Sequence, residues 1–178
     1  AVWFWMFRKA GRYELGQGVL ADAVFVVKTP SFNSIHENLR RNRIWKSLKE
    51  YPSFEAYQAT LNAADSICDA HPVLKKLLID RPFAVSYHRV AASEYDFLYV
   101  CDLGKLNVIQ TLDRALAAWL NDGSMRMQRK GDITEIKTDS LSVFYAIRAN
   151  LLLASFSEKL VEKAVADCGN RTEMDYRA

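Results

Sequence analysis

The chain has 178 residues, of which 50% are apolar and 25% charged, and its 24 basic and 21 acidic residues leave a net charge of +3. With 7 Gly, 4 Pro and 3 Cys, this composition excludes a disordered chain, a collagen-like rod and a disulfide-stapled mini-protein. The charge is too small for a dedicated nucleic-acid binder, so nucleic acid is not an expected partner. The length fits one globular domain.

The first twelve residues change abruptly from aromatic to cationic. Seven apolar residues, Ala1 to Phe7, precede a group of basic side chains. This order matches the interfacial end of a membrane helix, where aromatic rings and long basic side chains sit at headgroup level. No apolar run reaches the ~18 residues of a complete span, so the segment resembles the cut end of a longer helix. The residues expected at the interface are Trp3, Trp5, Arg8, Lys9 and Arg12. The alternative is an aromatic first strand of the domain.

The first half of the domain alternates between strand and helix patterns. A β-branched run at 23–28, ended by Pro30, predicts a strand buried on both faces. Helical spacing then predicts helices over 31–51 and 53–70, with one or two further turns at 73–79. Two strands follow at 83–90 and 95–101, separated by a loop of hairpin length.

The second half is richer in strands. Apolar spacing from Leu106 to Trp119 predicts a helix. The dipeptides at 131–132 and 149–150 each separate two β-rich runs, which predicts strands at 125–130, 133–138, 141–148 and 151–155. Ser157 is positioned to cap a final helix. The fold class predicted is α+β, a mainly antiparallel sheet of about six or seven strands with helices covering one face.

The expected organisation has three parts. Residues 1–19 form the membrane-helix end and juxtamembrane segment, 20–169 form one α+β domain, and 170–178 form a tail that continues into a C-terminal region. A flexible approach to the domain is the expected role of Gly16 and Gly18. Their spacing superficially matches a dinucleotide-binding fingerprint, but no strand clearly precedes it.

Few residues form a pattern that is typical of a catalytic or metal-binding site. Ser86 and His88 lie two apart on one predicted strand, so their side chains share a face, and Asp96 lies on the neighbouring strand. A hydrolase using Ser86 or Cys101 with His88 is therefore one hypothesis. It lacks the sharp turn on which a nucleophilic serine usually sits, so a polar pair at the surface or core rim is favoured. No metal-binding spacing is present, no cofactor is expected, and Cys68, Cys101 and Cys168 are expected as buried free thiols.

The best candidate for a binding surface is a basic helical cluster. Such a face can hold phosphates or anionic headgroups, although a solvated helix face is the alternative. The cluster consists of Arg40, Arg41, Arg43, Trp45, Lys46 and Lys49.

Several stretches, taken in order, resemble a bacterial domain-of-unknown-function family of membrane-anchored envelope proteins. They are Ala21-Asp22-Ala23-Val24-Phe25-Val26-Val27, Ile44-Trp45-Lys46-Ser47-Leu48, Val85-Ser86-Tyr87-His88, Tyr95-Asp96-Phe97-Leu98-Tyr99-Val100, Phe144-Tyr145-Ala146-Ile147 and Leu151-Leu152-Leu153-Ala154-Ser155-Phe156-Ser157. The resemblance covers Leu20 to Cys168. It implies an N-terminal membrane helix, an exported periplasmic region and a longer C-terminal continuation, and it supplies no catalytic residues.

The function predicted is a non-catalytic, membrane-anchored binding or scaffolding module of the bacterial envelope. Its expected partners are the inner membrane, through the N-terminus, and either another protein or the C-terminal remainder of its own chain. The alternatives are the hydrolase, phosphate or nucleic-acid binding through Arg40 to Lys49, and a cytoplasmic location.

Overall fold

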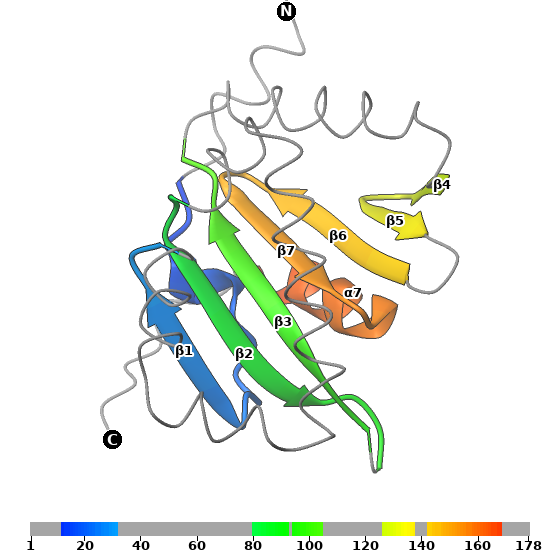
Figure 1. Ribbon diagram of the computed structural model, residues 1–178, viewed down its shortest axis with the longest axis horizontal. Helices are drawn as coiled ribbons and strands as arrows, with labels where there is room; N and C mark the ends of the chain where they lie inside the picture. The colour runs from blue at the N-terminus through cyan, green and yellow to red at the C-terminus, as the bar shows by residue number, and fades with distance from the viewer. Residues whose placement is uncertain (1–11, 32–79, 93, 105–125, 138–141, 169–178) are drawn as a thin grey trace, which may run out of the picture. The chain divides into compact units, whose positions relative to one another are not determined.

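The described part of the chain is an antiparallel sheet with one α-helix packed against it (Figure 1). A computed structural model describes residues 12–31, 80–92, 94–104, 126–137 and 142–168. Apart from residues 29–31 and 80–82, these belong to one compact unit comprising 1–28 and 83–178. The elements are η1 (Leu15–Gly18), β1 (Phe25–Thr29), β2 (Phe83–Arg89), β3 (Tyr95–Asp102), β4 (Arg126–Lys130), β5 (Ile133–Lys137), β6 (Ser142–Arg148), β7 (Leu151–Ser155) and α7 (Glu158–Asp167).

The seven strands lie in the order β1-β2-β3-β7-β6-β5-β4. Strands that follow one another along the chain are neighbours on each side, and the antiparallel pair β3 and β7 joins the two halves, with Tyr99 opposite Ala154. This arrangement confirms the predicted antiparallel sheet and its upper strand number. It leaves β1 and β4 as the two terminal strands.

The three predicted strand pairs are confirmed at nearly the predicted boundaries. Gly131 has a φ of 63° in the turn between β4 and β5, a conformation that glycine adopts without steric cost. Ala149 has a φ of 51° in the turn between β6 and β7. The final helix is also present, with Ser157 at the predicted N-cap position, although its side chain makes no capping hydrogen bond.

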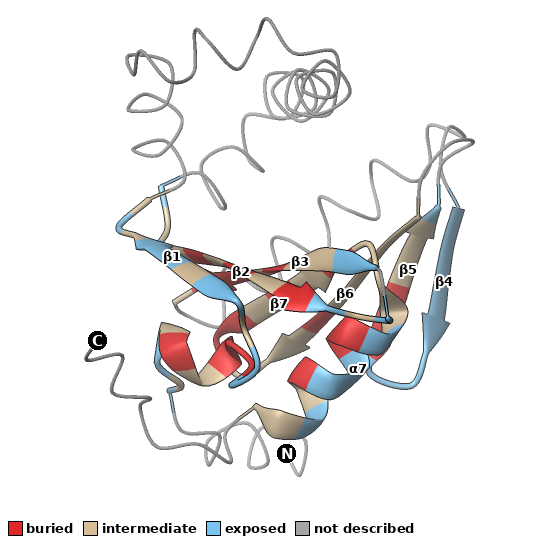
Figure 2. Ribbon diagram, turned by 90° about the horizontal axis from the view of Figure 1, so that it is seen from below, coloured by how far each residue is buried: buried red, intermediate tan, exposed pale blue. Residues whose placement is uncertain are grey.

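The core lies between the sheet and α7, on the lower side of the sheet in Figure 2. Alternation along each strand turns every second residue to this face, and the strands there present small or aliphatic side chains. From α7, Leu160, Val161 and Ala164 are buried against them. The buried apolar strand residues are Ala84, Leu98, Val100, Ile133, Ala146, Leu151 and Leu153.

The segment before β1 belongs to this core. Gly16 and Gly18 lie in the 3-10 helix η1, and Val19 and Leu20 are almost completely buried beside Val100 and Leu153. The prediction of a flexible approach at the two glycines is therefore wrong, and residues 12–19 pack with the domain instead of lying outside it. The physical reason is that a glycine can also be selected for close approach, which spacing alone does not distinguish from flexibility.

The prediction that the first strand is buried on both faces is also wrong. β1 is a terminal strand, and Phe25 and Val27 are exposed whereas Val26 packs against the core. A continuous apolar run is compatible with burial on both faces, but it does not reveal whether a strand lies inside a sheet or at its edge.

Candidate functional site

Ser86 and His88 lie side by side on the core face of β2. His88 Nε2 is 2.7 Å from Ser86 Oγ, and both side chains are fully buried, with exposed fractions of 0%. The Ser86 hydroxyl also lies 3.4 Å from the carbonyl oxygen of Leu98, on the neighbouring strand β3. The shared face predicted from their spacing is confirmed, whereas a position at the surface or core rim is wrong. The β2 strand lies within the sheet, and its Ser86 face is the one that carries the core.

The carboxylate that hydrogen-bonds to His88 is Asp22, although Asp96 lies directly opposite His88 in the register of β2 and β3. Asp22 Oδ1 lies 3.2 Å from His88 Nδ1, and the Asp22 Oδ2 atom accepts a hydrogen bond from Lys163 of α7. Asp96 instead accepts hydrogen bonds from Ser155 Oγ at 2.8 Å and from the Phe97 backbone N–H. Asp22 was missed because it precedes β1, more than sixty residues from His88, and no local signal connects the two.

Asp22, His88 and Ser86 are connected in the same order as a catalytic triad. Ser86, however, lacks the position that a nucleophilic serine requires. A nucleophilic serine must meet its substrate, and it usually sits on a sharp turn beside free backbone N–H donors. Ser86 is at the middle of β2 opposite Leu98, and it is closed off from solvent. We expect these residues to form a polar link between the pre-β1 segment, β2 and α7, buried at Ser86 and His88 and half exposed at Asp22 and Lys163.

We expect Ser86 to remain unlabelled when the native protein is incubated with a fluorophosphonate, because the reagent cannot reach the buried hydroxyl. Intact-mass spectrometry after incubation measures this, and a serine hydrolase of known activity treated in parallel serves as the control for the reagent. A stoichiometric adduct mapped to Ser86 in native protein would restore the hydrolase hypothesis.

Burial is the largest influence on the pKa of His88. Removal from water lowers the pKa of His88, the hydrogen bond and charge of Asp22 raise it, and the positive charge of Lys163 lowers it, with a net decrease. For Asp22, burial raises the pKa, but the hydrogen bonds and charges of Lys163 and His88 outweigh it, so the pKa is lowered overall. A neutral imidazole with its proton on Nδ1 satisfies both contacts, since Nε2 then accepts the Ser86 hydroxyl proton.

We expect the protein to lose stability as the pH falls below about 6.5, the ordinary pKa of histidine. In this range an unfolded chain binds a proton at His88 that the folded chain excludes, because the folded pKa is lowered. The free energy of unfolding should therefore decrease with a slope approaching ~1.4 kcal/mol per pH unit until the folded pKa is reached. Asp22 contributes separately and only in acid, where its lowered pKa is crossed.

Urea unfolding between pH 7.5 and 5 measures this slope. A double variant with His36 and His71 both changed to Asn retains it, because His88 is then the remaining histidine. A slope that disappears in the double variant would assign the effect to the other two histidines.

Neither of the two described thiols, Cys101 and Cys168, is a partner of His88. Cys101 is buried, but it lies opposite Phe83 in the register, on the sheet face away from Ser86 and His88. A Cys101–His88 dyad is therefore wrong. Cys168 is half-buried, and burial raises the pKa of its thiol despite the opposing charge of Arg148, which disfavours the reactive thiolate. Cys68 lies outside the described residues.

A second polar cluster joins the chain before η1 to the ends of β3 and β7. The Asn150 amide donates to Asp102 Oδ1 at 2.7 Å and to the Tyr13 carbonyl at 2.9 Å, and its oxygen accepts the Tyr13 N–H at 2.7 Å. Gly104 N–H also donates to Asp102, and Arg12 lies 3.2 Å from the same carboxylate. Burial raises the pKa of Asp102, but these donors and the Arg12 charge outweigh it and lower the pKa. Arg12, predicted at a membrane interface, is thus placed beside Asp102.

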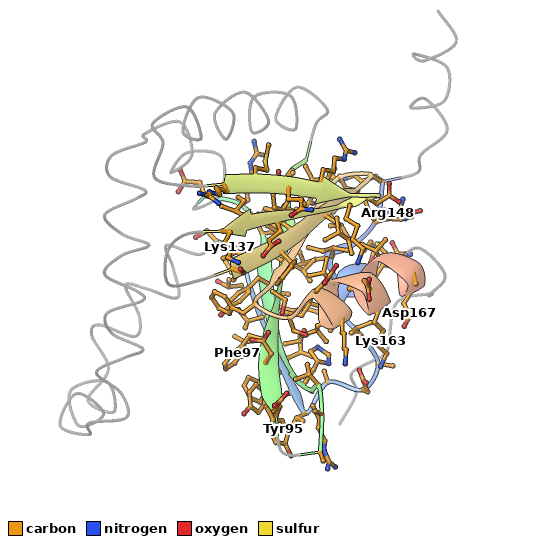
Figure 3. All side chains as sticks on the ribbon, turned by 90° about the vertical axis from the view of Figure 1, so that its right-hand side faces the viewer. Tyr95, Phe97, Lys137, Arg148, Lys163 and Asp167 are labelled. Atoms are coloured by element: carbon orange, nitrogen blue, oxygen red, sulfur yellow. The ribbon has the colours of Figure 1, made fainter. Side chains whose placement is uncertain are left out.

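Aromatic side chains gather on the other face of β1, β2 and β3. Figure 3 places Tyr95 and Phe97 on the side of β3 away from Lys163 and α7. Tyr87 stacks on Phe25 and on Tyr95, with ring centroids 5.3 and 5.2 Å apart. Further ring contacts link this group to Phe83, Tyr99 and Phe156. Aromatic residues recur at alternate positions along 83–89 and 95–101. This alternation is the sequence pattern that places these rings on one face of the sheet.

One small open pocket of about 220 Å³ lies between β4, β5, β6 and the start of α7. The Lys130 ammonium and the Glu158 carboxylate in its wall are 3.2 Å apart and neutralise each other. Its lining residues are Gln128, Lys130, Ile133, Glu135, Phe144 and Glu158.

Across the described residues, no group of three histidine, cysteine or carboxylate side chains is arranged to hold a metal ion.

Several predicted site residues lie outside the described part of the chain. They are the basic cluster Arg40, Arg41, Arg43, Trp45, Lys46 and Lys49, and the interface residues Trp3, Trp5, Arg8 and Lys9. Among the described residues, no helix has both the length and the hydropathy to cross a membrane.

No protein-family model, curated protein or solved structure matches this chain. The resemblance to an envelope family stays a prediction from sequence.

Proposed function

We propose that this domain is a non-catalytic binding or scaffolding module whose binding surface is the apolar edge formed by β1 and its neighbouring rings. The observation that carries the proposal is the position of the exposed large apolar side chains. Three lie in β1 or directly before it, and the fourth, on β3, joins them through the ring of Tyr87. Val24, Phe25, Val27 and Tyr95 have exposed fractions of 62, 46, 45 and 48%. Contiguous exposed apolar surface, with aromatic rings at its centre, is typical of protein interaction sites.

The occupant that fits this edge is an extended apolar segment of a partner protein. β1 ends the strand order of the described sheet, and a terminal strand is the place where a partner protein can add a strand. Lys28 is its single charged residue, which favours a partner strand of low charge. In the same surface, Phe25 of β1 and Tyr87 of β2 stack on each other. Their rings offer a flat surface to apolar side chains of the partner.

The test places a photo-cross-linking amino acid at Val24 in the full-length protein in its native cells. We expect a discrete adduct with one partner protein, lost when Val27→Lys is added, because a lysine there charges the contact surface. Lys159 on α7, also exposed, is the control position and should give no such adduct. The proposal fails if position 24 yields no adduct, or yields the same adducts as position 159.

The second element of the proposal is attachment to a bacterial envelope membrane through the segment that precedes the domain. It is supported by the order of aromatic and basic residues at 1–12 and by the family resemblance. In the same proposal, further helices of the chain join α7 in covering the sheet. Membrane fractionation and protease accessibility of a tag after Ala178 test the attachment. A tag in the soluble cytoplasmic fraction would contradict it.

A further inference from the structure

The β4 strand, at the opposite edge of the sheet from β1, has a different chemistry. All five of its residues are exposed, as the pale blue ribbon in Figure 2 shows. In the sheet, β4 pairs with β5 and ends the strand order. No described strand pairs with its other edge, where backbone N–H and C=O groups can accept an added strand.

The hairpin of β4 and β5 brings two cations together. Arg126 and Lys137 are directly opposite in the antiparallel register, which puts their Cβ atoms about 4.5–5.5 Å apart on one face. Like charges in this position destabilise a sheet. Among the residues that the structure describes, neither side chain forms an ion pair. An anion beside the two side chains would replace their repulsion by attraction.

Two further cations lie on β4, Arg129 and Lys130. Lys130 lies on the same face as Arg126, because the two residues are four positions apart on one strand. Its ammonium contacts the Glu158 carboxylate, but Lys130 is exposed and Glu158 is partly exposed, and an ion pair in contact with water contributes little. Arg129 is on the other face, where its Nε donates to the Gly131 carbonyl. Cations thus lie on both faces of β4, with the Glu135 carboxylate of β5 as an acidic neighbour on the Arg126 face, opposite Gln128.

We propose that β4 binds an acidic peptide in extended conformation, which pairs with it as an eighth strand. Carboxylates at alternate peptide positions lie opposite Arg126, Gln128 and Lys130, while the peptide backbone satisfies the outer edge of β4. The backbone hydrogen bonds select an extended chain, and the cations select its charge. Because β4 itself carries no aromatic residue on which bases could stack, a protein segment fits it better than a single-stranded nucleic acid.

This inference is independent of the proposed function, because it uses the other terminal strand and a partner of opposite character. The probe is a fluorescently labelled seven-residue peptide that alternates glutamate with valine or threonine. Fluorescence anisotropy of the peptide with the full chain, in buffer of low ionic strength, measures binding. Two control peptides separate charge from strand pairing: one has lysine for each glutamate, and one keeps the glutamates but has proline at alternate positions.

We expect saturable binding of the glutamate peptide, no binding of the lysine peptide and at least tenfold weaker binding of the proline peptide. The variants Arg126→Glu and Lys137→Glu should each weaken binding at least tenfold, while Lys159→Glu, a matched charge change on α7, leaves it unchanged. Either hairpin variant replaces the repulsion between positions 126 and 137 by attraction, so each should fold at least as stably as the parent.

Amide hydrogen exchange of β4 in the presence of the peptide then shows where the strand is added, with slower exchange expected across 126–130. Three results would overturn the proposal. These are absence of binding to the glutamate peptide, equal binding of the proline peptide, and binding that neither hairpin variant weakens.

Discussion

Replacing Asn150 by alanine is expected to lower the free energy of unfolding by about 3 kcal/mol. Its amide makes three hydrogen bonds, two to the Tyr13 backbone and one to the Asp102 carboxylate. The bond to a carboxylate is the strongest of these, because an ionised acceptor binds a donor more tightly than a neutral one. Alanine leaves the buried oxygen of Asp102 with fewer donors and releases the chain at Tyr13. Chemical denaturation measures the loss, and hydrogen exchange at the Tyr13 amide reports the local release.

The control is Arg12→Ala, which removes a different partner of the same carboxylate. The Arg12 side chain is 75% exposed, so its ion pair is screened by water and its removal should change stability by less than about 1 kcal/mol. If Arg12→Ala destabilises the protein as much as Asn150→Ala, the buried amide is not the group that holds this cluster.

Gly18→Ala is the second substitution with a large expected effect, a loss of about 2 kcal/mol. A Cβ at this position would lie 2.7 Å from Val100 Cγ1 and about as close to methyl groups of Leu151 and Leu153. These side chains belong to central strands and are fully buried, so they cannot move aside without disturbing the core. Thermal and urea unfolding of the variant measure the loss.

Gly16→Ala is the matched control, two residues away in the same 3-10 helix. There a new Cβ would meet the Lys28 Nζ at 3.1 Å, and the end of a lysine side chain can move at little cost. We expect a change of less than about 0.5 kcal/mol. Equal losses at positions 16 and 18 would mean that the conformation of η1, and not the contact with the core, determines the effect.

The two terminal strands suggest that the sheet has two interaction edges of different chemistry. β1 and the residue before it expose Val24, Phe25 and Val27, whereas β4 has the exposed cations Arg126, Arg129 and Lys130. Charged side chains commonly protect a terminal strand from nonspecific pairing. In the two proposals, the charges of β4 also restrict the strands it can accept, while β1, whose single charged residue is Lys28, favours an apolar partner.

The strand pairs were predictable because each is encoded locally. Gly131 supplies the positive φ that a short turn needs, and the flanking residues of β4 and β5 have the composition of strands. The pairing of β2 with β3 likewise needs only a short loop between two β-rich runs. Such signals lie within about twenty residues of each other, so no knowledge of the rest of the chain is required.

The polar sites were predictable only in part. The shared face of Ser86 and His88 follows from strand alternation, but their burial depends on α7 and the pre-β1 segment covering that face. Asp22 reaches His88, and Asn150 reaches Tyr13, across separations of 66 and 137 residues. Neither pair shares a motif or a periodic pattern, because a contact between distant segments leaves no spacing in the sequence.

The strand pairs and the final helix follow from the sequence alone, since they depend on turn residues, periodicity and short spacing. The tertiary structure is needed to know which strands end the sheet, whether Gly18 is flexible or packed, and which carboxylate hydrogen-bonds to His88. The order of strands in the sheet controls all three. Pairing β3 with β7 buries the centre of the sheet and leaves β1 and β4 at its edges, so burial and exposure follow from neighbours that are distant along the chain.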